Sequence, residues 1–491
     1  MKFKTRKTWE NDAGNQISQP LRQYEPESLE QIIAIIKEAE KHERQVRAIG
    51  SGHSWSDVGI TTDFLVKPNR LNKVLDLEPS LLSDGVETST LFRVESGITF
   101  RKLNDELDSA GLALPNMGGY DGQTIAGVIS TSTHGTGIEF GPLSDIVISL
   151  EIVSDGGQVY RIEPADGVTN RVKYENEHPN IKLIQDDDWF NAVVVSMGCM
   201  GVIYSVILRV RDKFWLKEVR TLSTWDEVKE DLKQGNALKS SEHYEVLVNP
   251  HKVDGNHRCL ITRRDPTDPP KDLPADKTNR NFLSEFLSSL PFLQKLANLI
   301  FNAKPDITDD VINSGMEALV DDSYIKISYK VFNVGVANDI PAISSEIGFP
   351  LKDNKYIEAV DRFLELAEEH KSLGNLYHTA PVSLRFVKAS KAFLSMMHGY
   401  DTCMMEIILA KDTQGGFEML RRYENELYKF SGRPHWGQVN SMTGSHDLIN
   451  SMYPKYDKWI EIYEKLNKNG TFDSPFTKRV GFSKETFAEI L

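Results

Sequence analysis

Cysteine is scarce in this chain, with three residues among 491. Cys199, Cys259 and Cys403 stand apart, and none has a neighbour at C-x-x-C or other metal-site spacing. An odd number of isolated cysteines argues against a disulfide framework and is typical of a reducing compartment. The sequence therefore predicts a cytoplasmic protein without a metal centre.

Long hydrophobic runs are also lacking. No apolar run follows the basic residues at 1–7, so we expect no secretory signal. The most apolar stretch, 281–301, is interrupted by Glu285, Pro291 and Lys295, whereas a membrane-spanning helix needs about 20 mostly apolar residues. Its pattern favours an amphipathic helix pair that bends at the proline and is buried or forms a lid, without membrane association. Docking on a membrane surface is the alternative.

Positive charge is in deficit, because 57 Lys and Arg stand against 71 Asp and Glu, a formal net charge of −14. Such a surface repels polyanions, so we expect no nucleic-acid partner. At 491 residues the chain is also long for one core, since single cores stop growing beyond about 250–300 residues. The length therefore predicts two domains.

The apolar pattern predicts an α+β chain with an α/β-type opening. Apolar residues at three- and four-residue steps indicate a helix at 28–42, and a short strand at 45–49 then runs into Gly50. We place the end of a first domain near Arg211, before an α+β half with one long insertion. The other expected elements of the first half are strands at 91–94 and 202–210, a helix at 100–110, and a hairpin of 146–153 with 159–162. Those of the second half are strands at 244–248 and 325–331, a helix at 355–370, and a proline-rich loop at 265–276.

The loop after the first strand reads G-S-G-H-S-W from Gly50 to Trp55. The nicotinamide fingerprint G-x-G-x-x-G is lacking, but glycines after a strand let backbone N–H groups approach an anion such as a diphosphate. A plain structural turn is the alternative. His53, at the tip of the loop, is well placed as a nucleophile, although a lone histidine is more often structural.

A second segment, 118–137, reads G-G-Y-D-G-Q-T-I-A-G-V-I-S-T-S-T-H-G-T-G. Its glycines allow close backbone approach, and its hydroxyls supply hydrogen bonds without bulk. Loops of this length inside compact domains are usually functional, with a merely structural loop as the alternative.

Together these segments resemble the PCMH-type FAD-binding domain of the vanillyl-alcohol oxidase superfamily, in its aldonolactone oxidase and alditol oxidase branch. Two further motifs support the resemblance. Residues 197–203, M-G-C-M-G-V-I, are similar to the branch's turn L-G-x-L-G-V-I, and residues 433–437, R-P-H-W-G, to its motif P-H-W-x-K. The resemblance implies a two-subdomain FAD-binding domain at 1–212, an α+β substrate-binding cap domain at 213–430, and a C-terminal segment at 431–491 that returns to the flavin.

The resemblance also implies which residues hold FAD. The first loop would carry the diphosphate, the second segment would lie along the flavin and ribityl chain, and Ile203 would contact the cofactor through its backbone. The implied cofactor-binding residues are Gly50, Ser51, Gly52, His53, Ser54, Ser56, Gly118, Gly119, Thr124, Gly127, Thr131, Ser132, Thr133, His134 and Ile203.

Two of these residues bear on the chemistry. His53 matches the histidine that many members bond to the 8α-methyl of the flavin, so we expect covalent FAD, with a non-covalent neighbour of the flavin as the alternative. Gly118 matches a position where oxidases carry glycine and related dehydrogenases carry a bulkier alanine that hinders oxygen. Glycine there favours an oxidase, and a simple turn glycine is the alternative.

On the substrate side the resemblance is incomplete. The cap strand of the family often carries a Glu-x-Arg pair; Arg385 matches, but Ser383 stands in place of the glutamate. Likewise Gln438 stands in place of the lysine of P-H-W-x-K, and both changes remove a charge, which leaves the identity of the alcohol open. The expected catalytic residues are Arg385, as an orienting or electrophilic group or else a surface charge; His435, as a base or a group that orients the flavin; and Gln438.

The implied reaction is oxidation of the CH–OH group of a small polar alcohol, such as a sugar lactone or a polyol, by hydride transfer to the flavin N5. Dioxygen would accept the electrons and yield hydrogen peroxide. Two alternatives are a flavin dehydrogenase with another acceptor and a flavin-binding protein with a divergent pocket.

Overall fold

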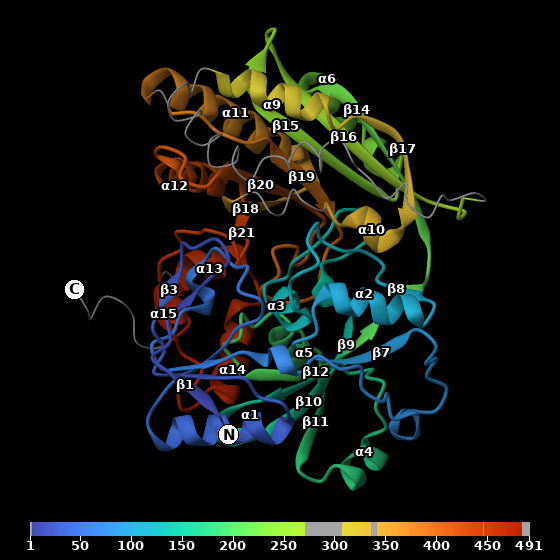
Figure 1. Cartoon of the computed structure of the whole chain (residues 1–491), viewed down its shortest axis with the longest axis vertical. Coiled ribbons are helices and arrows are strands. Elements are labelled where there is room, and N and C mark those ends of the chain that lie inside the picture. Colours follow the sequence, from blue (N-terminus) through green and yellow to red (C-terminus); the bar gives the residue numbers. More distant parts are fainter. Residues whose placement is uncertain (1, 271–306, 335–340, 375, 445, 484–491) are drawn as a thin grey trace.

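The computed structural model describes residues 2–270, 307–334, 341–374, 376–444 and 446–483. The chain forms two halves stacked along the long axis of the molecule (Figure 1). The lower half contains residues 2–212 together with the described residues that follow Pro434, and the upper half contains the described residues between them. The helix pair predicted at 281–301 lies outside the described residues.

Two sheets and a helix between them organise the lower half. Helix α1 (Leu29–Lys41) begins at Ser28, whose side chain accepts a hydrogen bond from the Gln31 N–H, a typical N-cap. Its buried isoleucines share one core with both sheets. Within the described residues, the first sheet has the order β1 (Phe3–Thr5), β4 (Arg22–Tyr24), β6 (Phe64–Val66), β5 (Val46–Ala48), and the second β11 (Ile181–Gln185), β10 (Val159–Glu163), β9 (Val147–Val153), β12 (Val202–Arg209), β7 (Leu91–Glu95).

Shorter elements complete this half. The predicted helix at 100–110 is α2 (Phe100–Ser109), which ends before Gly111 at a φ of +74°, and the predicted hairpin is the antiparallel pair β9–β10. The remaining elements are β2 (Trp9–Glu10) paired with β3 (Ile17–Ser18), β8 (Leu112–Ala113) paired with β13 (Arg211–Asp212), α3 (Ile125–Ser130), α4 (Arg171–Glu177) and α5 (Asp187–Val193).

An antiparallel sheet forms the upper half. In the described part of the chain its order is β17 (Asp321–Ile327), β14 (Trp215–Thr224), β16 (Asn256–Thr267), β15 (His243–Val253), β19 (Val382–Val387), β20 (Thr402–Ala410), β18 (Ala342–Pro350), β21 (Arg433–Pro434). Its helices are α6 (Trp225–Lys233), α9 (Thr308–Glu317), α10 (Ser328–Phe332), α11 (Lys355–Gly374) and α12 (Gly416–Leu427).

Alternation along the central strands gives this sheet two different faces. Leu384, Phe386 and Met405 lie on the face that packs with α6, α11 and α12 in one apolar core. The intervening positions, such as Arg385 and Glu406, carry charge on the opposite face. The sequence therefore builds a sheet with an apolar outer face and a polar inner face.

The C-terminal residues cross back from this sheet to the lower half. Helices α13 (His446–Met452), α14 (Tyr456–Leu466) and α15 (Pro475–Val480) follow β21. The Trp459 indole N–H donates to the Val195 carbonyl at 3.2 Å, and the Val46 N–H of β5 donates to the Thr471 carbonyl at 2.7 Å. These contacts support the predicted three-part division of the chain, which remains a prediction.

Two secondary-structure predictions are wrong. The strand expected at 325–331 ends at Ile327 and continues as α10, because a helical turn lets the neighbours Val331 and Phe332 enter the same core, whereas a strand would send them to opposite faces. The loop expected at 265–276 begins as strand, since β16 continues to Thr267. There Pro266 pairs with β14 alone, at the end of β16 where β15 no longer pairs, and such a strand end tolerates proline.

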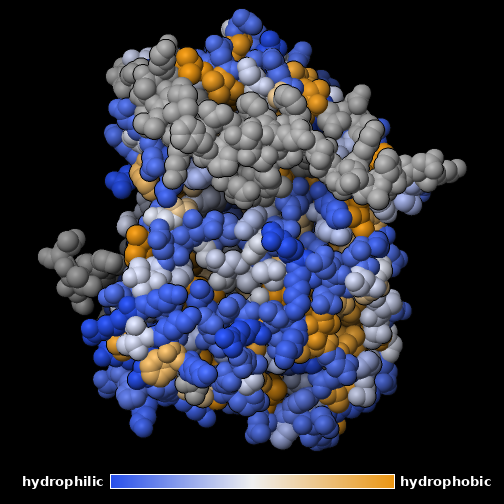
Figure 2. Space-filling view, viewed as in Figure 1, coloured by the Kyte–Doolittle hydropathy of each residue, from blue (hydrophilic) through white to orange (hydrophobic). Residues whose placement is uncertain are grey.

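The visible surface is mainly hydrophilic, with apolar residues in small patches (Figure 2). Among the described residues, the helices do not combine the length and apolar character that crossing a membrane requires.

Candidate active site

The glycine-rich segments meet around one cleft of the lower half, about 960 Å³ including its open mouth. Of the residues that the sequence assigns to FAD, those that line the cleft are Gly50, Ser51, Gly52, His53, Ser54, Thr124, Gly127, Thr131, Thr133 and Ile203.

The first glycine loop is held directly against the second segment. A Cβ at Gly50 would lie 2.1 Å from Thr124 Oγ1, so only glycine permits this approach. Gly52 has a φ of +83°, in the left-handed region that glycine tolerates. The Ser51 hydroxyl donates to the Gly122 carbonyl at 2.5 Å and ties the two segments together.

The second segment contains a short helix that sequence reasoning missed. Helix α3 follows Thr124, whose side-chain hydroxyl is buried at the cleft and has no hydrogen-bond partner among the described residues. An unpaired buried hydroxyl is costly, so a ligand that bonds to it would be stabilised. Close-packed glycines and this hydroxyl fit the diphosphate and ribityl oxygens of a bound FAD.

The third motif closes the cleft from the side of β12. The Met197 N–H donates to the Ser130 carbonyl at 3.0 Å, which joins the motif to the end of α3. Arg47 is buried beneath this junction and donates to the carbonyls of Met197 and Val58. The residues of this junction all line the cleft: Arg47, Val58, Ser130 and Met197.

The fourth motif is hydrogen-bonded to the first loop. The Trp55 N–H donates to the Gly437 carbonyl at 2.8 Å, and the Ser56 hydroxyl donates to the Trp436 carbonyl at 2.7 Å. Ser56 therefore joins two motifs and does not line the cleft. Four segments that are far apart in the sequence thus converge on one site.

His53 lies at the cleft with 18% of its side chain exposed. Its Nδ1 is 3.5 Å from Asp12 Oδ2, and its ring centroid is 4.1 Å from that of Tyr120. Burial lowers the pKa of His53, against the opposing effect of the Asp12 carboxylate. A neutral imidazole has a free lone pair, as a nucleophile requires.

Four other implied cofactor residues lie outside the lining of this cleft. Ser132 is buried against Ser395, with the two hydroxyl oxygens 2.7 Å apart. The Val334 N–H donates to the Gly119 carbonyl at 2.9 Å. His134 points to the upper half, with Nε2 3.2 Å from Glu346 Oε1. The four are Gly118, Gly119, Ser132 and His134.

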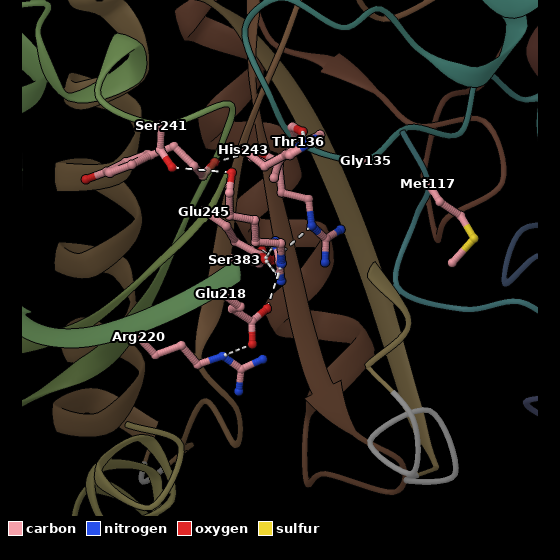
Figure 3. Close-up of polar contacts among 12 residues, drawn as sticks. Met117, Gly135, Thr136, Glu218, Arg220, Ser241, His243, Glu245 and Ser383 are labelled. Atoms are coloured by element: carbon pink, nitrogen blue, oxygen red, sulfur yellow. Dashed lines mark hydrogen bonds and ion pairs between the residues drawn. The ribbon is translucent and has the colours of Figure 1, made fainter. Parts of the chain in front are cut away.

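On the polar face of the upper sheet, Arg385 is held between two carboxylates. Its Nε donates to Glu245 Oε1 at 3.1 Å and its Nη1 to Glu406 Oε2 at 2.9 Å. The Ser383 hydroxyl donates to the same Glu245 oxygen at 3.1 Å (Figure 3). Sequence reasoning found the arginine but missed both glutamates, which lie on the neighbouring strands β15 and β20.

The alternation of charge continues across the sheet. Arg264 on β16 donates to Glu245 on one side and to Glu218 on the other, and Arg220 pairs with Glu218 at 3.0 Å (Figure 3). A buried arginine between two glutamates keeps each carboxylate compensated. This charged row, made of Arg220, Glu218, Arg264 and Glu245, therefore holds Arg385 in position from one side.

The carboxylates of this cluster differ in proton affinity. Burial opposes ionisation of Glu245, yet Arg385 and Arg264 hold its pKa at about 2. The pKa of Glu346 is likewise about 2, because His134, His435 and Arg385 together outweigh its burial. Burial raises the pKa of Glu406 despite Arg385, with the nearby Glu346 adding to the rise.

His435 and Gln438 lie between the cluster and the first loop. Burial lowers the pKa of His435 to about 4, so its ring is neutral at neutral pH, and its Nδ1 accepts the Gly437 N–H at 3.0 Å. The His435 ring centroid is 6.3 Å from that of His134. Gln438 is buried, and its Oε1 has no hydrogen-bond partner among the described residues.

Comparison with known proteins agrees with this arrangement. Residues 206–480, more than half of the chain, match the profile of the D-arabinono-1,4-lactone oxidase family, and residues 20–163 match that of an FAD binding domain. FAD is therefore the cofactor of this chain.

Relatives match over nearly the whole length. The L-gulono-1,4-lactone dehydrogenase of Mycobacterium tuberculosis is 28% identical over 480 residues, covering 96% of this chain and 98% of that protein. The L-gulonolactone oxidase of Mus musculus is 27% identical, covering 94% and 95%. The crystal structure of cholesterol oxidase from B. sterolicum has the same fold, with a TM-score of 0.75 at 13% identity over 98% of this chain and 97% of that one. The chain thus belongs to the D-arabinono-1,4-lactone oxidase family of FAD-dependent oxidoreductases.

Proposed function

We propose that this protein oxidises a CH–OH group of a sugar lactone, with FAD attached covalently to His53 and dioxygen as the final electron acceptor. The observation that carries the proposal is the contact between His134, from the cofactor-binding segment, and Glu346, beside the arginine–carboxylate cluster. It joins the segment that contains α3, part of which lines the cleft, to a polar surface suited to a hydroxylated substrate. The names of the M. tuberculosis and mouse relatives both refer to a gulonolactone, which supports the substrate class.

The chain's own residues would bind and orient the substrate. FAD, when bound, supplies a two-electron acceptor for the hydrogen of the alcohol carbon. Arg385 offers guanidinium N–H groups to a lactone oxygen, and the carboxylate row behind it keeps that group from moving. Gln438 offers an unpaired buried carbonyl oxygen that can accept a substrate hydroxyl. Burial of the cluster excludes water and strengthens these contacts.

Replacing His53 with alanine should abolish covalent attachment of the flavin. The neutral imidazole at the cleft is the group we propose to bond to the cofactor, and alanine has no nucleophile. On a denaturing gel under ultraviolet light, the wild-type band should fluoresce and the His53→Ala band should be dark. His446→Ala, at an exposed histidine, should keep the fluorescence. A dark wild-type band, or a fluorescent His53→Ala band, would contradict attachment at this residue.

Replacing Gly118 with alanine should slow reoxidation of the reduced enzyme by dioxygen. A Cβ at Gly118 would lie 3.4 Å from the His134 carbonyl oxygen and 3.9 Å from Thr133 Cγ2, so alanine fits but occupies space next to the proposed flavin site. We expect a decrease of about tenfold, equal to about 1.4 kcal/mol in the barrier. Stopped-flow mixing of reduced enzyme with air-saturated buffer measures this rate.

Gly315→Ala in α9 is the matched control, because its Cβ meets nothing within 4 Å, and its reoxidation rate should stay unchanged. Slow reoxidation of the wild type itself would favour a dehydrogenase with another acceptor, as the name of the M. tuberculosis relative suggests.

A further inference from the structure

We propose that Glu406 is the general base of the reaction: its carboxylate, supplied from β20, accepts the proton of the substrate hydroxyl. This inference rests on the proposed oxidation of a lactone alcohol. It assigns a catalytic role to a residue outside the recognisable motifs of the chain.

The register of the sheet places Glu406 beside Ser383. Ser383 and Glu406 are direct cross-strand partners on the polar face, and side chains in such pairs lie about 4.5–5.5 Å apart at Cβ. Ser383 lies two residues before Arg385 on β19 and carries no charge. A carboxylate from β20 therefore lies beside the position that lacks one on β19, and it still pairs with Arg385 at 2.9 Å.

Glu406 accepts fewer side-chain hydrogen bonds than the neighbouring Glu245. The Glu245 carboxylate accepts hydrogen bonds from Arg264, Arg385 and Ser383, so both of its oxygens already have partners within the protein. Arg385 Nη1 donates to Glu406 Oε2, and this bond does not use Oε1. Its side chain is 12% exposed, so a small opening reaches it. A substrate hydroxyl can donate to Oε1 while Arg385 holds Oε2.

Glu406 also differs from the neighbouring carboxylates in its affinity for a proton. The groups that face Glu406 are Arg385 on β19, Glu245 on β15, Glu346 on β18 and His134 from the lower half. Burial, with Glu346 and Glu245 adding to it, raises the pKa of Glu406, whereas those of Glu245 and Glu346 are about 2. Of these three carboxylates, Glu406 therefore holds a proton best, as a base requires.

Oxidation of the alcohol removes one proton and one hydride from the substrate. The substrate O–H bond breaks and its proton passes to Glu406 Oε1. The C–H bond on the same carbon breaks, and its hydrogen leaves with both electrons to the bound flavin, which is reduced. The oxygen lone pair closes the carbonyl, so the alcohol carbon is oxidised and no further reactant is needed.

The test compares anaerobic flavin reduction by L-gulono-1,4-lactone and D-arabinono-1,4-lactone in the wild type and in Glu406→Gln, across pH 4 to 9. The wild-type rate should rise with pH through an inflection above the ordinary carboxyl pKa, because the base must be ionised. Glu406→Gln should be about 10²–10³-fold slower and lose the inflection. The lactone dissociation constant, from perturbation of the flavin absorbance, should change less than about threefold, because glutamine can still accept a hydrogen bond.

Two further variants keep the test decisive. Ser383→Glu added to Glu406→Gln returns a carboxylate to β19 and should restore part of the rate together with a pH inflection. If Glu406→Gln does not fold, Glu406→Asp keeps the charge and should retain the inflection at a lower rate. Glu406→Gln with the wild-type rate and pH profile overturns the role of Glu406 alone. A wild type that binds FAD but is reduced by neither lactone overturns the proposed function as well.

Discussion

Replacing Arg385 with methionine should reduce the rate of flavin reduction by lactone about 10²–10³-fold, the usual cost of removing one preorganised charged donor. The same change should destabilise the fold by about 3 kcal/mol, because removing one partner leaves the Glu245 and Glu406 carboxylates facing each other in a buried site. Stopped-flow reduction measures the first effect and chemical denaturation the second.

Arg385→Lys separates charge from geometry. Lysine keeps the positive charge but cannot bond to both carboxylates through a planar fork, so we expect a stability between those of wild type and Arg385→Met. Arg209→Met is the matched control, because this arginine is exposed at the end of β12 and should tolerate the change. If the flavin of Arg385→Met were reduced by lactone at close to the wild-type rate, Arg385 would not take part in substrate binding or catalysis.

Replacing Gly50 with alanine should empty the cofactor cleft of most of its FAD. The φ of Gly50 lies outside the left-handed region, so the effect is steric: the new Cβ would lie 2.1 Å from Thr124 Oγ1. Either the first loop or α3 must move, and overpacking of this kind costs about 1–3 kcal/mol. The ratio of flavin absorbance to protein in the purified sample should fall severalfold.

The double variant Gly50→Ala/Thr124→Ala tests that cause. Removing the hydroxyl leaves Thr124 Cβ at 3.4 Å and Gly127 Cα at 3.7 Å as the nearest atoms, which are ordinary contacts. Flavin content should recover relative to the single variant, although the lost Thr124 hydroxyl keeps it below the wild type. Full flavin content in Gly50→Ala alone would show that the two segments are not packed as closely as the structure has them.

Elements with local signals could be predicted from the sequence. Helix α1 has an apolar stripe and a serine cap, and the β9–β10 hairpin has glycines in its turn, so neither depends on distant contacts. That the four motifs meet at one site was predicted from a family resemblance and not from local pattern. In the structure, the contacts of Trp55 with Gly437 and of Gly50 with Thr124 hold the motifs together.

The cluster around Arg385 could not be predicted, because it depends on strand register. Glu245 and Glu406 are separated from Arg385 by 140 and 21 positions, and no local pattern states which residues face one another across β15, β19 and β20. Alternation could have placed each glutamate on a polar face, but not beside the arginine. The same holds for α10, where burial of Val331 and Phe332 in a distant core overrides the strand-like composition.

The contacts of residues 459–471 with the lower half constrain the order of folding during synthesis. The strand that carries the first glycine loop is bonded to Thr471, and Trp459 packs beneath the segment before the third motif. N-terminal regions usually fold first on the ribosome. A nascent chain that has emerged only as far as the strands of the upper sheet still lacks the contacts of Trp459 and Thr471. Stable binding of FAD is therefore expected only once residues 459–471 have left the ribosome and reached these contacts.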